Sequence, residues 1–322
     1  MRALLLGGAG FVGLHLARRL LADGCSVTIV DDFSRGRADR EFDLLAADPR
    51  VDVRAADLTD PAGWADLPHG WDQVYLLAAV VGVRNVESDP ARVVRVNSLA
   101  ALHAVDWLAP GDRVFFASTS EVYAGGVDLG VVPVPTAEDV PVVLADVTAP
   151  RFAYAVSKLL GEAAFLHGAR ARGFSAVVGR FHNVYGPRMG ADHVIPELSL
   201  RALRGEDPFR VYGVNQHRAF CYVDDAVEAM VRLMRAPAAA GRIVHIGDDT
   251  AETNIGDLAK LVLEINGTSP ALAAVAAPAG SVARRRPDLR LLRELTGYRP
   301  AVPLAEGVRR TYEWYRECWP GR

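Results

Sequence analysis

Cysteine is scarce in this chain of 322 residues, which has three: Cys25, Cys221 and Cys318. They lie far apart, and none belongs to a CxxC pair or has a histidine at the spacing of a metal ligand. This pattern argues against a disulfide framework and against a structural zinc site. We expect reduced, structural thiols and no bound metal.

Long apolar runs and an excess of charge are also missing. The longest apolar stretch, residues 76–83, has the length of a buried strand and falls short of the roughly 18 residues of a membrane helix. Lys and Arg total 36 against 39 Asp and Glu, so the net charge of −3 gives no general attraction to nucleic acid or an anionic membrane. Early glycines interrupt the segment that resembles a signal peptide. We expect a cytoplasmic protein whose phosphate sites are local.

The composition is that of a packed globular protein, with 50% hydrophobic and 23% charged residues. Helical segments separate several apolar segments of strand length, which are residues 3–6, 26–30, 51–55, 74–77, 114–118 and 175–181. Alternating strands and helices predict a Rossmann-type α/β fold with a doubly wound parallel sheet. One helix is expected to begin at Pro90, behind the capping residue Asp89, and another covers residues 154–172.

The second part of the chain has a different character. From about residue 182 onward it has more loops, punctuated by pairs such as Gly186-Pro187 and Asp207-Pro208. We therefore predict two lobes, which a chain of this length can form. The first is a dinucleotide-binding domain over residues 1–178, to which residues 214–241 return. The second is a smaller substrate-binding lobe over residues 179–213 and 242–322.

A glycine-rich turn follows the first predicted strand. Gly7, Gly10 and Gly13 have the spacing at which a backbone approaches a pyrophosphate closely, and the helix that begins there offers its N–H groups. Asp31 ends the second strand about 18 residues further on, where a carboxylate binds a ribose diol and repels a 2′-phosphate. The pattern predicts a bound dinucleotide, NAD in preference to NADP.

Two neighbouring features bear on the same site. Arg35 and Arg37 follow Asp31 closely and are groups that would instead favour a 2′-phosphate. Asp57 and Leu58 follow the third predicted strand and are candidate adenine contacts, with a surface turn as the alternative.

A second pattern concerns proton transfer. Tyr154 and Lys158 are four positions apart on a predicted helix, so they share one face. The cation favours a phenolate, which can take a proton from a substrate hydroxyl while hydride leaves the same carbon. Upstream, the Ser-Thr-Ser-Glu of residues 118–121 ends a predicted strand, at the edge where doubly wound sheets bind ligands.

Together these segments resemble the extended short-chain dehydrogenase/reductases, the NAD-dependent nucleotide-sugar epimerase/dehydratase family. The resemblance covers nearly the whole chain. Its marks are Gly7-Gly8-Ala9-Gly10-Phe11-Val12-Gly13, Leu77-Ala78-Ala79, Ser118-Thr119-Ser120-Glu121-Val122-Tyr123, Tyr154-x-x-x-Lys158, Arg180-Phe181-His182-Asn183-Val184-Tyr185-Gly186-Pro187 and Arg218-Ala219-Phe220-Cys221-Tyr222-Val223-Asp224-Asp225. It implies an enzyme that remodels the sugar of a UDP-linked or similar nucleotide-sugar, and a homodimer formed through two helices of each chain.

The resemblance also implies roles for single residues. Tyr154 becomes the acid/base, Lys158 its electrostatic partner and a ribose ligand, and Thr119 the hydroxyl that bonds sugar O4. Glu121 is a further catalytic candidate, or a carboxylate that bonds local backbone N–H groups. The implied cofactor contacts are Gly7, Gly10, Phe11, Val12, Gly13, Asp31, Asp57, Leu58, Leu77, Ala78, Ala79, Tyr154 and Lys158. The implied substrate contacts are Val83, Ser120, Glu121, Asn183, His193, Arg218 and Arg286.

Several substrate contacts have structural alternatives. Arg218 and Asn183 suit a diphosphate, since a guanidinium fork and an amide both donate to its oxygens. The alternatives are a surface salt bridge for Arg218 and a turn-stabilising role for Asn183. His193 either faces the sugar or is a solvated loop residue. The arginines of residues 284–286 either close on phosphate or a hexuronate carboxylate, or form a solvated charge run.

The reaction that follows oxidation at sugar C4 is the least determined. Dehydration is disfavoured because Ser120 replaces the Asp of the dehydratases. Glu121 and Arg286-Pro287-Asp288 are similar to UDP-glucuronate decarboxylases, in which a β-keto acid loses carbon dioxide. Those enzymes usually have Tyr-Asp-Glu-Gly-Lys at the catalytic tyrosine, whereas this chain has Tyr-Ala-Val-Ser-Lys. That departure favours a 4-epimerase of a UDP-hexose or UDP-hexuronate, with the decarboxylase of UDP-xylose synthase type as the alternative.

Two further alternatives have less support. A 3,5-epimerase, which His182 and residues 284–286 resemble in part, needs two more acid/base groups. No cysteine stands near Glu121 to serve as one, so Glu121 or His193 would have to substitute. A non-catalytic NAD-binding regulator usually loses the Tyr or Lys of the pair, and both Tyr154 and Lys158 are present.

Overall fold

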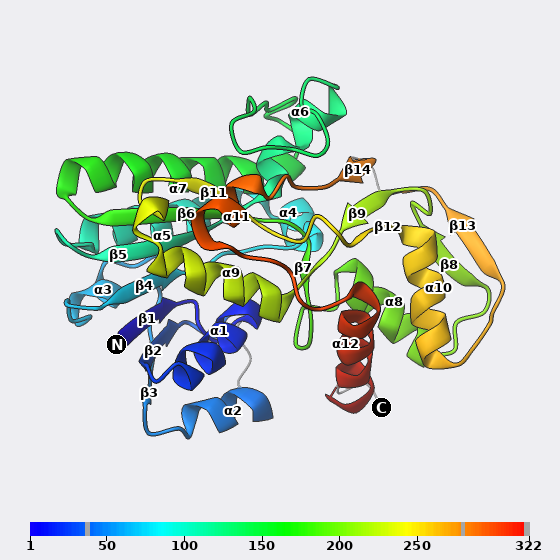
Figure 1. Cartoon of the computed structure of the whole chain (residues 1–322), viewed down its shortest axis with the longest axis horizontal. Coiled ribbons are helices and arrows are strands. Elements are labelled where there is room, and N and C mark those ends of the chain that lie inside the picture. The colour runs from blue at the N-terminus through cyan, green and yellow to red at the C-terminus, as the bar shows by residue number, and fades with distance from the viewer. Residues whose placement is uncertain (36–38, 278–280, 319–322) are drawn as a thin grey trace.

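The computed structural model describes residues 1–35, 39–277 and 281–318. Within these ranges, a seven-stranded sheet has the order β11-β6-β5-β4-β1-β2-β3, and all its pairs are parallel (Figure 1). The strands are β1 (Arg2–Leu6), β2 (Ser26–Asp31), β3 (Val51–Ala55), β4 (Gln73–Leu76), β5 (Arg113–Thr119), β6 (Ser175–Phe181) and β11 (Ile243–Ile246). This order, with its reversal between β1 and β4, is that of a Rossmann fold. The predicted fold class is confirmed.

Strand β11, at the edge of this sheet, was not predicted from the sequence. The apolar segments predict the other six strands within one residue of their observed ends. β11 has four residues and pairs with β6, from Ile243 opposite Val178 to Ile246 opposite Phe181. The division into two lobes remains a proposal, in which residues 243–246 now belong to the first lobe.

Helices cover both faces of the sheet, as Figure 1 shows. α1 (Phe11–Ala22) and α9 (Val223–Arg235) pack with one face in a shared hydrophobic cluster. α3 (Ala62–Ala65), α5 (Pro90–Trp107) and α7 (Arg151–Arg172) enclose a second cluster on the other face. α7 lies very close to β5, because a Cβ at Gly161 would stand 2.3 Å from the Phe116 ring. This close approach sets the position of the polar residues at the start of α7.

The remaining elements build the second lobe and the surface of the first. Short strands form small sheets of order β10-β7, β12-β9-β14 and β13-β8 in the described residues. Their bounds are β7 (Val184–Tyr185), β8 (Phe209–Tyr212), β9 (His217–Ala219), β10 (Cys221–Tyr222), β12 (Glu252–Asn254), β13 (Leu272–Val275) and β14 (Arg284–Arg285). The helices are α2 (Arg40–Ala46), α4 (Val83–Ser88), η1 (Ser120–Tyr123), α6 (Ala124–Asp128), α8 (Val194–Leu203), η2 (Pro237–Ala239), α10 (Ile255–Asn266), α11 (Arg290–Thr296) and α12 (Leu304–Cys318).

Arg188, between β7 and α8, reaches from the second lobe to residues 7–13, called the glycine loop below. One guanidinium nitrogen donates to the carbonyl oxygens of Ala9 at 2.9 Å and Gly10 at 3.1 Å, and Nε donates to Asp39 at 2.7 Å. The side chain is 1% exposed. The second lobe therefore contacts the back of the predicted cofactor loop through a buried cation.

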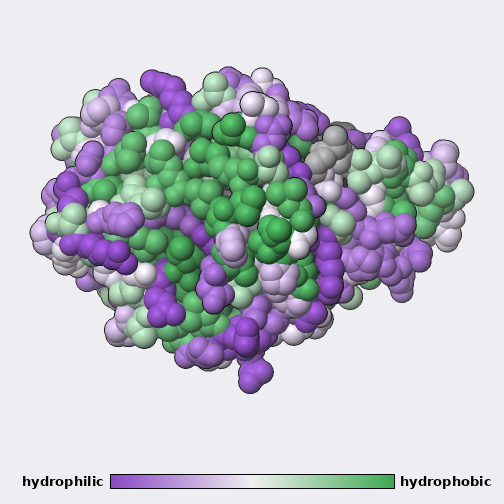
Figure 2. Space-filling view, turned by 90° about the horizontal axis from the view of Figure 1, so that it is seen from above, coloured by the Kyte–Doolittle hydropathy of each residue, from purple (hydrophilic) through white to green (hydrophobic). Residues whose placement is uncertain are grey.

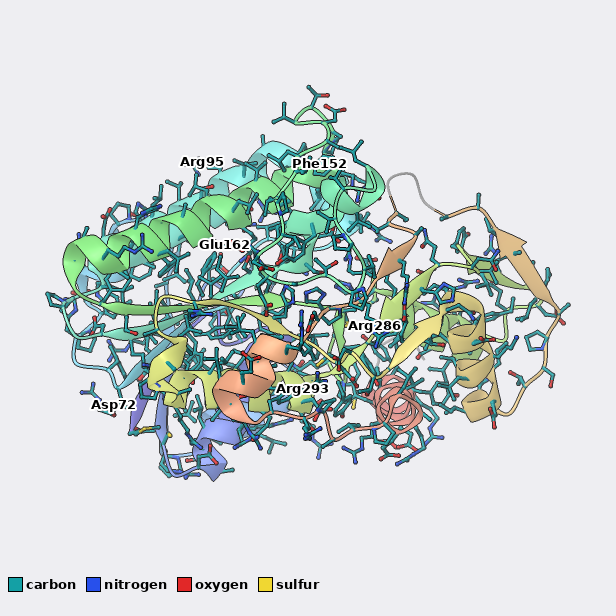
Figure 3. The ribbon with its side chains drawn as sticks, turned by 45° about the horizontal axis from the view of Figure 1, so that its top comes forward. Asp72, Arg95, Phe152, Glu162, Arg286 and Arg293 are labelled. Atoms are coloured by element: carbon teal, nitrogen blue, oxygen red, sulfur yellow. The ribbon has the colours of Figure 1, made fainter. Side chains whose placement is uncertain are left out.

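A buried ion pair lies between α7 and the sheet. Glu162 accepts hydrogen bonds from Arg180 of β6 at 2.8 and 2.6 Å and from the Ser118 hydroxyl at 2.5 Å. Arg180 also donates to the Tyr123 hydroxyl. The Arg180 and Glu162 side chains are 4% and 5% exposed, and Figure 3 shows Glu162 beneath α7. The pair joins the strand that precedes Asn183 to the helix that carries Tyr154.

The described residues contain no disulfide bond. All three cysteines are free thiols: Cys25 and Cys221 are buried, whereas Cys318 is exposed. No helix of the described ranges is sufficiently long and apolar to cross a membrane. The same ranges hold no group of three or more His, Cys, Asp or Glu residues arranged for a metal ion.

Candidate active site

The predicted catalytic residues meet at the carboxyl edge of the sheet. Thr119 is the last residue of β5, and Tyr154 lies in the first turn of α7, where its phenol shares a hydrogen bond with the Thr119 side chain. Lys158 lies one turn further along α7 and donates to the carbonyl oxygen of Ala117 at 2.7 Å. Its ammonium nitrogen is 6.0 Å from the centre of the Tyr154 ring. The Thr, Tyr and Lys therefore form one cluster, as the spacing predicted.

The protonation of this cluster differs from the sequence expectation. Burial raises the pKa of Tyr154, and the charge of Glu121 raises it further, against smaller lowering effects of the Thr119 bond and of Arg35. Burial lowers the pKa of Lys158 to about 8, although Glu162 opposes the shift. The expected phenolate is therefore not the resting form, because the cost of burying a charge outweighs the nearby ammonium. The raised pKa favours the neutral phenol of Tyr154 before a substrate binds.

Glu121 and two arginines form the electrostatic centre of the site. Arg285 of β14 contacts Glu121 at 2.8 Å between guanidinium and carboxylate. β14 pairs with β9 in parallel, with Arg285 opposite Arg218. Burial and then the charge of Arg285 lower the pKa of Arg218 to about 10, while Glu121 opposes the shift. Arg285 pairs with Glu121, whereas Arg218 has no carboxylate at ion-pair distance in the described residues and stays available to an anionic ligand.

Of the three arginines at residues 284–286, Arg285 is the one that contacts Glu121. Its two neighbours form their ion pairs and hydrogen bonds with other residues, although Arg284 also lines the cavity beside Ser120. Arg284 binds Glu252 at 2.6 and 2.9 Å. Arg286, the predicted substrate contact, donates to the Asp249 carbonyl at 3.0 Å, and Figure 3 shows it on the side of Arg293, which pairs with the same aspartate. From this run the sequence predicted Arg286 as the substrate contact; alternation along a strand is the signal that separates Arg285 from its two neighbours.

The glycine loop fits the pyrophosphate of a dinucleotide. A Cβ at Gly7, where φ is +85°, would stand 2.4 Å from the backbone nitrogen of Ala78, so the loop and residues 77–79 are in close contact. Gly10 is the N-cap of α1 and supplies no side-chain hydrogen bond to the first turn. Phe11, Val12 and Gly13 begin that helix, whose positive end faces an anion placed there.

The other predicted cofactor contacts lie around this loop. Asp31 ends β2, and its carboxylate accepts from the N–H groups of Ala9 and Phe33, both at 2.9 Å. Leu77 and Ala78 donate to the Leu6 carbonyl, which places residues 77–79 beside the loop. Asp57 binds the N–H and hydroxyl of Thr59, both at 2.8 Å, and the Leu58 side chain is buried. Arg35 donates to the Val81 carbonyl at 2.7 Å, and Arg37 lies outside the described residues.

The remaining predicted substrate contacts are spread around the opening. Asn183 has a φ of +40° and donates through its amide to the Ala219 carbonyl at 2.9 Å, so it also stabilises the turn. Val83 begins α4 and is 63% exposed. His193 precedes α8, and burial together with Arg35 lowers its pKa. Ser120 is buried next to Glu121.

Arg218 offers a direct test of the anion site. Its guanidinium donates to the carbonyls of His217 and Ala283 and to Gln216, and in the described residues no carboxylate lies within ion-pair distance of it. We expect Arg218→Met to raise KM for a nucleotide-sugar by about 10- to 100-fold, the value of a lost charge-assisted hydrogen bond. Arg210→Met, which removes an exposed cation paired with Glu206, is the control. An unchanged KM for Arg218→Met in steady-state kinetics would place the diphosphate elsewhere.

Comparison with known proteins gives consistent matches. A family model described as the NAD dependent epimerase/dehydratase family matches residues 3–247. UDP-N-acetyl-alpha-D-glucosaminuronate decarboxylase of Bacillus cytotoxicus is 32% identical and covers 98% of both chains. UDP-glucuronic acid decarboxylase 1 of Xenopus tropicalis is 32% identical over 98% of this chain and 72% of its own. The structure of Thermus thermophilus UDP-glucose 4-epimerase in complex with NAD is 26% identical, with a TM-score of 0.83 and coverage of 99% and 100%.

Proposed function

We propose, because the chain belongs to the NAD-dependent epimerase/dehydratase family, that it decarboxylates a UDP-linked hexuronate. The sequence pattern around Tyr154 favoured a 4-epimerase, with the decarboxylase as the alternative. Relatives that match almost the whole chain are named decarboxylases of such substrates, which supports the alternative. The observation that carries the proposal is the contact of Glu121 with Arg285 beside Thr119 and Tyr154.

The side chains described above can supply the proton transfer and the charge interactions that this reaction needs. The glycine loop and Asp31 would hold NAD, which would accept hydride from sugar C4 and later return it. Tyr154 exchanges the proton of O4, and its hydrogen bond to Thr119 fixes the phenol toward that oxygen. Lys158 places a cation next to the phenol, which favours proton release once a substrate is bound. The resulting 4-keto acid loses carbon dioxide without a base at C5.

Arg285 is the group that distinguishes an acidic sugar from a neutral one. A cation that faces the sugar end of the site attracts a carboxylate at C6, whereas a neutral hexose offers it no charged partner. Glu121 already contacts Arg285, so a substrate carboxylate would share this guanidinium with Glu121.

The test is NMR of the purified protein with UDP-glucuronate and UDP-glucose. We expect a UDP-pentose and released carbon dioxide from the first and no change in the second. Arg285→Met should lower kcat/KM for UDP-glucuronate by about 100-fold or more, since a largely desolvated charge partner is lost. Arg210→Met, which removes an exposed cation of β8 that pairs with Glu206, is the control and should retain activity. A C4-inverted hexuronate with all its carbons would identify an epimerase and refute the decarboxylase.

We also propose a homodimer in which α5 and α7 of two chains pack together. Leu102 of α5 and Leu160 of α7 are 41% and 39% exposed, and Figure 2, which looks down on α7, shows a broad hydrophobic area. We expect light scattering to give the mass of a dimer for the native chain and of a monomer for Leu102→Glu combined with Leu160→Glu. Leu272→Glu, at a residue with 42% exposure in β13, should remain dimeric. A monomeric native chain would contradict this proposal.

A further inference from the structure

His182 is a buried histidine whose two ring nitrogens have no hydrogen-bond partner among the described residues. It directly follows β6, and its backbone N–H donates to the Ile246 carbonyl at 2.8 Å. Its side chain packs edge-on against His245, with ring centres 4.5 Å apart, and the residue is 1% exposed. Buried polar atoms are nearly always satisfied, so this ring marks a place where water or a ligand group completes the bonding.

The ring is neutral and can therefore both donate and accept. Burial holds the pKa of His182 well below its usual value, and the nearby charges of His245, Arg285 and Arg180 lower it further. A neutral imidazole has one N–H donor and one nitrogen lone pair. Such a ring can orient a water molecule in a defined direction.

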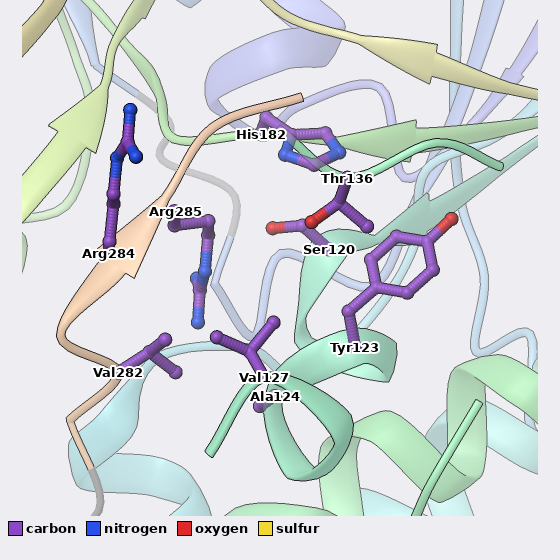
Figure 4. Close-up of a pocket in the computed structure, with 9 residues that line it drawn as sticks. All are labelled: Ser120, Tyr123, Ala124, Val127, Thr136, His182, Val282, Arg284 and Arg285. Carbon is purple, nitrogen blue, oxygen red and sulfur yellow. The ribbon is translucent and has the colours of Figure 1, made fainter. Parts of the chain in front are cut away.

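The His182 ring faces an enclosed cavity next to the catalytic residues (Figure 4). The cavity admits a group about the size of one water molecule. Its wall combines hydroxyls and guanidinium groups with apolar side chains, namely Ser120, Tyr123, Ala124, Val127, Thr136, Val282, Arg284 and Arg285. Apolar side chains form most of its surface, and the His182 ring together with the hydroxyls and guanidinium groups supplies the polar partners that a bound water requires.

Ser120 connects this cavity to the sugar. It stands between Thr119, which bonds Tyr154, and Glu121, which contacts Arg285. If O4 lies at Thr119 and the carboxylate at Arg285, C5 lies between them, next to Ser120. With the substrate placed in this way, C5 is next to the part of the cavity wall that Ser120 forms.

We propose that His182 and Ser120 hold one water molecule in this cavity, and that this water supplies the proton that C5 takes up after decarboxylation. The inference rests on the proposed function. His182 acts through the water and is a positioning residue.

The atoms and charges of the step balance. Loss of carbon dioxide breaks the C5–C6 bond, whose electron pair forms an enolate across C5, C4 and O4. The enolate then forms a C5–H bond with a proton of the water, and C4 becomes a ketone again. The hydroxide that remains lies beside the Arg285 cation and takes up one solvent proton, the single proton that decarboxylation consumes overall.

The experiment compares the native holoenzyme with His182→Phe, His182→Asn and the control His167→Asn, an exposed histidine of α7. With UDP-glucuronate in D2O, the native enzyme should place one deuterium at C5 with a single configuration. His182→Phe should lower kcat by about 10- to 100-fold with little change in KM, because a misplaced reacting group costs this much. Reduced nicotinamide should accumulate during turnover, since oxidation precedes the slowed step. His182→Asn, which keeps a polar group, should recover part of the rate.

Three outcomes overturn the inference. The first is His182→Phe with native kcat, native C5 labelling and no accumulated reduced nicotinamide. The second is a crystal structure of the native holoenzyme that has no water within hydrogen-bond distance of His182, a readout independent of activity. The third is a native enzyme that releases no carbon dioxide from UDP-glucuronate but binds water at His182; it refutes the proposed function and with it the proton step, while the water site itself remains.

Discussion

Replacing Tyr154 with Phe is expected to lower kcat by about 10²- to 10⁴-fold, the usual contribution of a positioned acid/base. The phenol shares a hydrogen bond with Thr119, and the Lys158 ammonium nitrogen is 6.0 Å from the centre of the Tyr154 ring. Tyr154 is therefore the proton carrier of the cluster. The ring itself remains in Phe, so NAD affinity and the unfolding midpoint should stay close to native. Carbon dioxide release from UDP-glucuronate measures the loss.

Tyr212→Phe is the matched control for this variant. Tyr212 ends β8 in the other lobe and is 38% exposed, so loss of its hydroxyl should leave kcat unchanged. A Tyr154→Phe enzyme with more than about a tenth of native kcat would show that another group moves the O4 proton. His193, which lies on the Arg35 side of the opening, would then be the next residue to vary.

Removal of the buried cation between α7 and β6 should give the largest loss of stability. Arg180→Met leaves Glu162 buried with its main partner gone, and breaking such a pair costs about 3–5 kcal/mol. Urea unfolding followed by tryptophan fluorescence measures the free energy. Arg309→Met, which breaks an exposed pair with Glu306, should cost less than about 1 kcal/mol.

A double variant separates the ion pair from the space it fills. Arg180→Met combined with Glu162→Leu removes both charges, and apolar residues of similar volume often replace a buried pair without loss. We therefore expect the double variant to be more stable than Arg180→Met alone. Equal effects of Arg180→Met and Arg309→Met would mean that water reaches Glu162 and that the pair is not effectively buried.

The first lobe was predictable because its signals are local. Strands such as Val51–Ala55 and Ser175–Phe181 are apolar runs next to clear turns, and their observed bounds match the prediction. The glycine loop and Asp31 follow the spacing that a bound dinucleotide imposes. β11 was not predictable in this way, because its four residues join the sheet only through pairing with β6, more than sixty positions earlier.

The candidate site was predictable in part. Thr119, Tyr154 and Lys158 lie together as expected, since a strand end and one helix face determine their positions. The choice of Arg285 over Arg286 depends on the register of β14 against β9, a pairing between segments far apart in the sequence. The missing partners of His182 are likewise a property of packing, which no spacing in the sequence reveals.

The residues between Tyr154 and Lys158 explain why the sequence favoured an epimerase. Their departure from the decarboxylase pattern was treated as chemical information. In the structure, Ala155 is buried, and the Ser157 hydroxyl donates to the Tyr154 carbonyl while it accepts from Asn97. Ser157 therefore serves the packing of α7 against α5, and its identity says little about which bond of the sugar is broken.

The contact of Arg188 with the glycine loop also determines how the loop's peptide groups are oriented. In a trans peptide the carbonyl and the N–H point in opposite directions, so holding the Ala9 and Gly10 carbonyls turns the N–H groups of Gly10 and Phe11 to the other side. A peptide flip here would break hydrogen bonds to a buried cation. The loop thus meets a diphosphate with its donors already aligned, and the conformational entropy of aligning them is lost during folding and not during binding.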